Sequence, residues 1–223
     1  MHRAALKVAL TLLLGSLMLL AVTAAGLRFD AGRVSDEAVT EAKAALASYR
    51  AVHPEVTSQA LAVVDYSQPS YSKRMAIIDL RSGQRSYYRV AHGKNSGELH
   101  ARRFSNTPES NMSSLGLFRV GERYYGDHGL ALRLDGLDSL RNGNAAKRDI
   151  VLHSAGYVSI PFILLNTLTF QGPRIGRSNG CFVVSKSEVS EVVEKLANGG
   201  FLYAWAGGQA LMDADGHRWT SMD

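Results

Sequence analysis

The chain contains a single cysteine, Cys181, among its 223 residues. One cysteine cannot form a disulfide within the chain, so a disulfide framework is excluded as a source of stability. A free cysteine is among the most frequently buried residue types, and the simplest interpretation is an inert thiol in a core. The other interpretation is a reactive thiol, which needs a base or a cation nearby and an approach for its substrate. The residues around Cys181 have to decide between the two.

Two further classes of function lack their usual sequence patterns. The seven histidines and the cysteine show neither His-x-x-x-His nor Cys-x-x-Cys spacing, so we expect no metal site and no cofactor. The chain has no block of Lys and Arg with interleaved aromatic residues, which argues against nucleic acid binding. Its formal net charge is +5, and loss of a segment carrying Arg3 and Lys7 lowers this by two to about +3. Such a mild positive bias suits work near an anionic cell envelope.

The N-terminal residues carry the clearest information about the cellular compartment. Arg3 and Lys7 precede an uncharged stretch rich in Leu and Ala, residues 8–25. Small residues at 22–25 suit a signal peptidase, so segment 1–25 resembles a secretory signal peptide. The apolar run is also just long enough to span a membrane, so an uncleaved anchor is the alternative. Both interpretations place the domain outside the cytoplasm, in the periplasm or cell envelope.

Helical periodicity appears at two places after this segment. Apolar residues recur at helical spacing within residues 33–50, where Ser35 or Asp36 can serve as the N-cap. The pattern at residues 185–188 is that of a capping box, which predicts a second helix ending at the glycines that follow Asn198. We expect the first helix to lie in an N-terminal segment, residues 26–54, that covers the main domain.

The rest of the sequence predicts a mainly β domain with flanking helices, arranged as a β-sandwich or barrel. Twenty-one glycines indicate many turns, and short β-branched or apolar runs recur between residues of the Gly, Asn and Asp type. We expect one domain over residues 55–206 and a polar tail over residues 207–223. The strand candidates are Leu61–Tyr66, Met75–Leu80, Ser86–Ala91, Leu115–Val120, Ala131–Leu134, Asp149–Leu152, Phe182–Val184 and Phe201–Ala206.

The residues that precede Cys181 favour a reactive thiol over an inert one. Gly176 and Gly180 permit an irregular loop, and Gly180 allows a substrate to approach the backbone closely. Consecutive N–H groups in such a loop can point the same way and form a nest for an oxyanion. Arg177 adds a positive charge that can bind a substrate carboxylate through a charge-assisted pair of hydrogen bonds. Such a loop is poorly suited to burying an inert thiol.

Three histidines are candidates for the same site. His153 follows the apolar run 150–152 and precedes small residues, so it can act as a general base on a thiol of a neighbouring strand. His128 lies between glycines and follows two tyrosines, which is typical of a pocket wall, and His92 begins a polar loop. We treat both as candidates for substrate contact. For each of the three, a structural histidine is the alternative.

These residues, in this order, resemble the L,D-transpeptidases of bacterial cell-wall synthesis. More narrowly, the sequence is similar to the YkuD-like branch of murein L,D-transpeptidase catalytic domains. The main motif of this family is a His followed by Gly or Ser and, later, Ser/Thr-x-Gly-Cys, here His153-Ser154 and Ser178–Cys181. The resemblance covers about residues 60–205. Its further patches are His92–Gly97, Phe104–Asn106, Ser113–Gly116, Tyr125–Gly129, Leu132–Leu134, Tyr157–Ser159 and Gly176–Ser178.

The resemblance implies a mostly β fold and a two-step acyl transfer on peptidoglycan stem peptides. Cys181 would attack the bond after the third residue of a tetrapeptide stem, D-Ala would leave, and an amine or water would take the acyl group. His153 would be the base, oriented by the backbone around Ser154, and the N–H groups of residues 179–181 would form the oxyanion hole. The candidates for substrate binding are Arg177, Ser178, Asn179, His128 and His92.

Two features depart from the commoner enzymes of the family. Those enzymes carry a histidine where this chain has Asn179, so His153 alone would activate the thiol. The segment between His153 and Cys181 is also longer, and its apolar stretch 160–170 suits a substrate lid, an interface with a membrane or partner, or core. With water as acceptor the enzyme would be an L,D-carboxypeptidase, and a wall-binding module without activity is a further alternative. The sequence does not indicate the oligomeric state.

Overall fold

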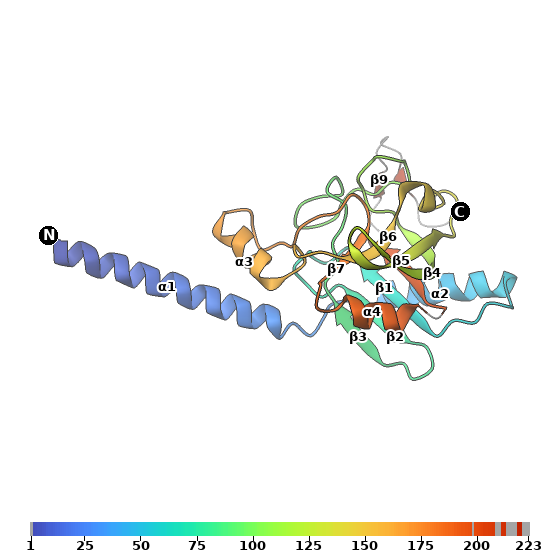
Figure 1. Cartoon of the computed structure of the whole chain (residues 1–223), viewed down its shortest axis with the longest axis horizontal. Helices are drawn as coiled ribbons and strands as arrows, with labels where there is room; N and C mark the ends of the chain where they lie inside the picture. Colours follow the sequence, from blue (N-terminus) through green and yellow to red (C-terminus); the bar gives the residue numbers. More distant parts are fainter. Residues whose placement is uncertain (1, 198, 208–210, 213–217, 220–223) are drawn as a thin grey trace.

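An eight-stranded sheet forms the centre of the computed structural model, which describes residues 2–197, 199–207, 211–212 and 218–219. Its strand order is β3-β2-β1-β8-β4-β5-β6-β7 (Figure 1). Strands β1 and β8 are parallel, as are β6 and β7, and the other neighbours are antiparallel. The strands are β1 Ala60–Asp65, β2 Met75–Asp79, β3 Arg85–Tyr88, β4 Gly116–Gly126, β5 Gly129–Gly136, β6 Val151–Ser154, β7 Phe182–Val184 and β8 Phe201–Trp205.

The two ends of the sheet approach each other. Ala91 follows β3 at one end, and its N–H donates to the carbonyl of Val183 in β7 at the other end, with an N–O distance of 2.8 Å. This bridge nearly closes the sheet into a barrel. The expected fold class, mainly β with flanking helices, is therefore confirmed. The helices are α1 His2–Arg28, α2 Asp36–Val52, α3 Ile160–Leu168 and α4 Val189–Leu196, with a short 3-10 helix at Ala146–Arg148.

Strand β1 is buried on both faces because a helix covers each side of the sheet. Ala62 and Val64 belong to the core that includes the apolar face of α4. Leu61 and Val63 point the other way and pack with the apolar residues of α2. Each Leu or Val side chain buried in this way contributes about 1.5–3 kcal/mol. The expected role of the first helix as a cover for the main domain agrees with this packing.

The N-termini of α2 and α4 can be compared with the caps predicted from the sequence. Ser35 is the N-cap of α2, and its Oγ accepts from the N–H of Ala38 at 3.2 Å, as expected. The capping-box prediction for α4 is wrong in detail. The N-cap of α4 is Glu188, and Ser185 Oγ donates to the Glu188 carboxylate at 2.5 Å. The two side chains therefore satisfy each other, and the helix starts one turn later than the pattern suggests.

Three strands differ from expectation in ways that matter for the site. Strand β6 covers Val151–Ser154 and not 149–152, because Asp149 ends the 3-10 helix in a left-handed conformation with φ 50°. His153 therefore lies within a strand. Strands β4 and β5 are longer than predicted and form a hairpin whose turn contains His128. The polar residues of this hairpin hide its strand pattern in the sequence.

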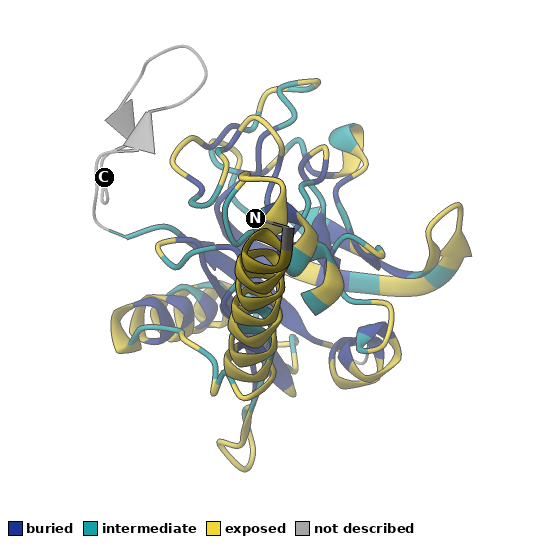
Figure 2. Cartoon of the chain, turned by 90° about the vertical axis from the view of Figure 1, so that its left-hand side faces the viewer, coloured by how far each residue is buried: buried dark blue, intermediate teal, exposed yellow. Residues whose placement is uncertain are grey.

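The N-terminal helix α1 leaves the body of the domain and is exposed along most of its length (Figure 2). The helix segment Arg3–Arg28 has 26 residues, and an 18-residue stretch within it has a mean hydropathy of 2.3, so it is long and apolar enough to cross a membrane. A signal sequence and an anchor fit this property equally. The expected polar tail from residue 207 lies mostly outside the described residues, of which strands β9 Leu211–Met212 and β10 Arg218–Trp219 pair with each other.

Candidate active site

The loop before Cys181 is fixed by hydrogen bonds to Ser178. The Ser178 N–H donates to the carbonyl of His92 at 2.9 Å, and the Lys94 N–H donates to the carbonyl of Ser178 at 2.7 Å. Ser178 Oγ donates to the carbonyl of Cys181 at 2.7 Å and accepts from the Gly180 N–H at 3.0 Å. The loop is thus bound to the segment after β3, and Cys181 is held at the start of β7, half-buried.

Gly180 is required at its position by the protein's own packing. Its φ of 128° lies in the region that favours glycine. A Cβ atom there would lie 2.9 Å from both the Met112 carbonyl oxygen and Ile150 Cδ1. Because the Gly180 N–H is bound to Ser178 Oγ, this donor of the expected oxyanion hole is occupied in the present conformation. Asn179, the next residue of the loop, is exposed.

The side chains of His153 and Cys181 lie on the same face of adjacent parallel strands. Leu152 of β6 is opposite Phe182 of β7, and both side chains are in the main core. Because side chains alternate along a strand, the residues on either side of this pair point to the other face. His153 lies opposite Val183, and Cys181, two residues before Val183, is therefore a diagonal neighbour of His153 on the same face. The two side chains therefore share one face of the sheet.

Burial keeps the thiol of Cys181 protonated. The Sγ atom donates to the carbonyl of Asp149 at 3.4 Å. Burial raises the pKa of the Cys181 thiol above its ordinary value, and the N–H of Val151 and the guanidinium of Arg148 lower it in part. A thiol in this state needs a base before it can attack a carbonyl.

Arg148 is a residue near the site that sequence reasoning missed. Its guanidinium donates to the carbonyls of Ser105 at 2.6 Å and Met112 at 2.5 Å. Its Nη2 atom would lie 3.1 Å from a Cβ atom on Gly180, so a half-buried cation lies directly against the loop. The position of Arg148 in a polar stretch, 33 residues before Cys181, gives no local signal for this contact.

His153 has the hydrogen bonding and charge state of a general base. Its Nδ1 is 3.1 Å from the carbonyl oxygen of Ser154. A carbonyl only accepts, so Nδ1 carries the hydrogen and Nε2 keeps its lone pair. Burial lowers the pKa of His153, and nearby His128 lowers it further, so the imidazole is neutral at pH 7. The ring of His128 stacks on that of His153, with centroids 4.5 Å apart.

A cleft of about 550 Å³ opens beside His128 and beside Ser154, the residue after His153. His128 reaches it from the turn of the β4–β5 hairpin and Ser154 from the end of β6, so both of these predicted residues line the cleft, while neither His153 nor Cys181 is among its lining residues. The lining residues are Asp127, His128, Gly129, Leu130, Ser154, Ala155, Gly156 and Lys186.

His92 has a different place from the one expected for a substrate contact. Its side chain is fully buried, its Nδ1 accepts from Arg74 Nη2 at 2.7 Å, and its Nε2 donates to the carbonyl of Gly97 at 3.1 Å. Burial and the charge of Arg74 lower the pKa of His92 to about 3. The side chain of His92 therefore forms hydrogen bonds in the interior of the domain. Its backbone carbonyl accepts the hydrogen bond from the N–H of Ser178.

The buried state of His92 makes the protein sensitive to acid. Between pH 6.5, its ordinary pKa, and about 3, the unfolded chain binds a proton at His92 that the folded chain does not. The free energy of unfolding should therefore fall as pH decreases, by about 3 kcal/mol from this residue between pH 7 and 4. Urea unfolding of the wild type and of His92→Gln over this range measures it. The variant should be less stable at pH 7 and should lose less stability on acidification, and parallel curves for the two would contradict the assignment.

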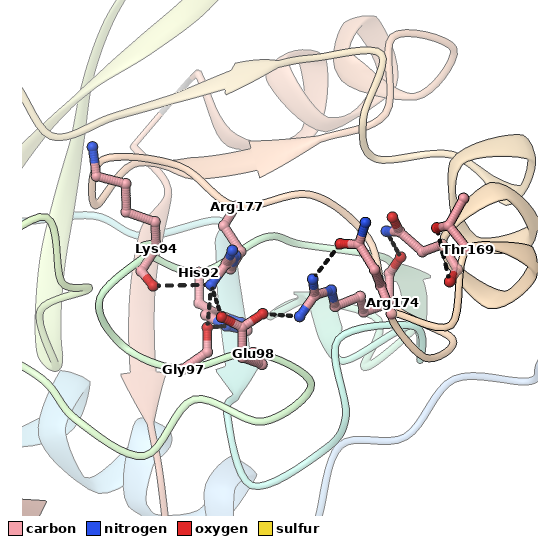
Figure 3. A network of polar contacts seen from close by, with 9 residues as sticks. His92, Lys94, Gly97, Glu98, Thr169, Arg174 and Arg177 are labelled. Atoms are coloured by element: carbon pink, nitrogen blue, oxygen red, sulfur yellow. Dashed lines mark hydrogen bonds and ion pairs between the residues drawn. The ribbon is translucent and has the colours of Figure 1, made fainter.

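Arg177 lines a second, cationic cleft, and Figure 3 shows its side chain beside Glu98. Its Nη1 atom is 2.5 Å from Glu98 Oε1 and 3.2 Å from the carbonyl oxygen of Lys94. Arg174 pairs with the same carboxylate from another direction. The cleft has a volume of about 380 Å³ and is lined by Lys94, Tyr157, Phe162, Asn166, Gln171, Arg174, Ile175, Gly176 and Arg177. Within the described residues, no group of three His, Cys, Asp or Glu side chains is arranged to hold a metal ion.

Comparison with known proteins agrees with the resemblance in the sequence. The family model of the L,D-transpeptidase catalytic domain matches residues 31–205. No curated protein matches the chain. Among solved structures, an L,D-transpeptidase from Mycobacterium smegmatis is similar at 12% identity and a TM-score of 0.39, and the L,D-transpeptidase LdtMt1 in complex with imipenem at 14% and 0.38. In both cases the match covers 66% of this chain and 59% of the other.

Proposed function

Because the chain belongs to the L,D-transpeptidase catalytic-domain family, we propose that it cross-links peptidoglycan stem peptides through a thioester on Cys181. The observation that carries this proposal is the shared face of His153 and Cys181 on adjacent strands. A neutral imidazole on the same face as a protonated thiol is the combination that general-base activation requires. The apolar N-terminal helix supports an exported enzyme.

In the proposed first step, His153 Nε2 takes the thiol proton while Sγ attacks the carbonyl of the third residue of a tetrapeptide stem. The N–H groups of Asn179 and Cys181 are the proposed donors to the resulting oxyanion. The C–N bond to the terminal D-Ala then breaks, and its amine takes the proton from His153. The products of this step are free D-Ala and a thioester between the remaining tripeptide and Cys181.

In the second step, an amine of a neighbouring stem attacks the thioester. His153 accepts a proton from the attacking nitrogen, the C–S bond breaks, and the proton returns to Sγ. The result is a peptide bond between two stems and a free thiol on Cys181. Water in place of the amine would give a tripeptide, which is the L,D-carboxypeptidase reaction.

The cationic cleft is the proposed site for a carboxylate of the donor stem. Arg177 already binds the carboxylate of Glu98, which is 59% exposed and therefore exchangeable. A substrate carboxylate that displaces Glu98 would gain the same pair of charged donors from Arg177 and Arg174. In this proposal Glu98 competes with the substrate for the cation.

We expect Glu98→Gln to lower KM for a tetrapeptide donor by up to about fivefold with kcat unchanged, since an exposed ion pair contributes at most about 1 kcal/mol. Arg177→Gln should raise KM by a similar factor. Steady-state kinetics of D-Ala release measure both. Glu122→Gln is the matched control, because it removes an exposed carboxylate paired with Arg133 on the β4–β5 hairpin. An unchanged KM in both test variants would exclude Arg177 from carboxylate binding.

Product analysis tests the proposed reaction. The purified protein is incubated with a disaccharide tetrapeptide, and the muropeptides are separated by chromatography and identified by mass. A dimer linked between the third residues of two stems supports transpeptidation, and a tripeptide alone supports hydrolysis. Unchanged tetrapeptide after long incubation would contradict both reactions.

A further inference from the structure

We propose that α1 stays attached as a membrane anchor and that α3 lies in the outer surface of the same lipid bilayer. Helix α3 and the turn after it carry an apolar surface formed by Leu165, Leu168 and Phe170, called here the α3 apolar surface. The proposal rests on the exported location under Proposed function, and it is independent of the chemistry of Cys181.

The end of α1 is fixed to the domain. Leu27 is 8% exposed and packs in an apolar cluster with Ile163 of α3. Arg89 Nη2 donates to the carbonyl of Leu27 at 2.5 Å. Asp30 accepts from the N–H of Lys73 at 2.8 Å and lies 3.8 Å from Arg89. If α1 spans the membrane, these contacts would therefore hold the domain in a defined position relative to the bilayer.

Helix α3 lies where such a membrane would end. It contacts α1 and projects from the domain on the side from which α1 leaves (Figure 1). Ala24 and Ala25, the last residues of the uncharged stretch, line a hollow together with Ile160 and Pro161 at the start of α3. A stretch of 18 helical residues is about 27 Å long, close to the hydrocarbon thickness of about 30 Å. The start of α3 therefore lies at the expected boundary between hydrocarbon and headgroups.

The side chains of the α3 apolar surface are largely exposed, and contact of such large apolar side chains with water is unfavourable. Leu165 and Leu168 are each 54% exposed, and Phe170 is 99% exposed. Phe29, directly after α1, is 82% exposed. Large apolar side chains that gather beside a membrane-spanning helix are typical of a membrane interface, where aromatic residues are enriched.

The backbone of Phe170 supports the same conclusion. Its φ of 59° is in the left-handed region, at the position after the helix where glycine is usual. The N–H of Gln171 donates to the carbonyl of Asn166 at 2.8 Å and closes this turn. An aromatic residue here bears the strain of this conformation and exposes its whole ring. Insertion of the ring into lipid accounts for the choice of Phe over Gly.

Membrane contact by α3 would also fix the height of the active site. Asn166 Nδ2 of α3 donates to the carbonyl of Arg174 at 2.8 Å, and Arg174 lies seven residues before Cys181. The helix also contributes Phe162 to the cationic cleft. The cysteine loop and the bilayer surface are thus joined through a single short helix.

Depth-dependent fluorescence quenching tests the inference in the full-length chain. Phe170→Trp is reconstituted into vesicles that contain lipids brominated along the acyl chain, which quench only nearby indoles. The parent chain corrects for its own two tryptophans. Leu140→Trp is the matched control, because Leu140 is 73% exposed in the loop after β5. We expect a blue-shifted emission and a marked loss of intensity for Phe170→Trp, and neither for Leu140→Trp.

Three outcomes would overturn the proposal. If the tryptophan at position 170 is quenched no more than the background given by the parent chain, α3 does not enter lipid. A blue shift at position 170 without quenching would mean that a protein partner or a second copy covers the surface. Failure of the full-length chain to associate with vesicles would exclude the anchor. Turnover of a soluble tetrapeptide is measured in parallel, so a loss of activity with intact quenching would count against the proposed function alone.

Discussion

Cys181→Ala should abolish both D-Ala release and cross-linking while the protein remains folded. The thiol makes one long hydrogen bond, to Asp149, and is only half-buried, so its loss removes little packing. Its chemistry has no substitute in the chain, because Cys181 is the single cysteine. Chromatography of muropeptides measures the activity, and thermal unfolding should show a Tm within about 4 °C of wild type.

Cys181→Ser is the conservative control for this experiment. It keeps the hydrogen-bonding capacity toward Asp149 but replaces the thiol with a hydroxyl that ionises far less readily. It should be folded and nearly inactive. If Cys181→Ala does not fold, while Cys181→Ser folds and retains near wild-type activity, the thiol is structural and the nucleophile lies elsewhere.

His153→Ala should slow acylation of Cys181 by about 10²- to 10⁴-fold, the usual contribution of a general base. Burial raises the pKa of the Cys181 thiol, so little thiolate is available without this base. Single-turnover release of D-Ala measures the acylation rate directly. In the wild type the rate should persist below pH 6.5, because burial lowers the pKa of His153 and keeps the imidazole neutral.

His128→Ala is the matched control for His153. Its ring stacks on that of His153 but is exposed, and its side chain is in the hairpin turn. Its removal should change the rate much less and should raise the pKa of His153, because nearby His128 lowers that value. The acidic limb of the pH profile then moves to higher pH. A near wild-type rate for His153→Ala would remove His153 from the mechanism.

Local patterns predicted much of the frame of the site. The short apolar run at Phe182–Val184 and the apolar spacing in Val189–Leu196 appear in the structure as β7 and α4, because each pattern depends on neighbours in sequence. The shared face of His153 and Cys181 was expected for the same reason. A histidine in an apolar run and a cysteine before another can meet if the runs pair as strands.

Contacts between distant segments account for most of what the sequence did not reveal. Arg148 lies against the cysteine loop, and Glu98 forms an ion pair with Arg177. In both cases the partners are far apart in the chain. His92 begins a polar stretch of sequence that is typical of a surface loop. In the structure its side chain is buried and hydrogen-bonded to Arg74. Such partners follow from the closure of the sheet and not from the spacing of residues.

Intact mass spectrometry of the full-length protein with a tetrapeptide muropeptide tests the central claim most directly. The proposed mechanism predicts a covalent adduct with the mass of the donor minus D-Ala, located on Cys181 by peptide mapping and absent from Cys181→Ala. His153→Ala should form the same adduct far more slowly. Turnover of the tetrapeptide by the Cys181→Ala protein, or an adduct on another residue, would contradict the assignment of Cys181 as the nucleophile.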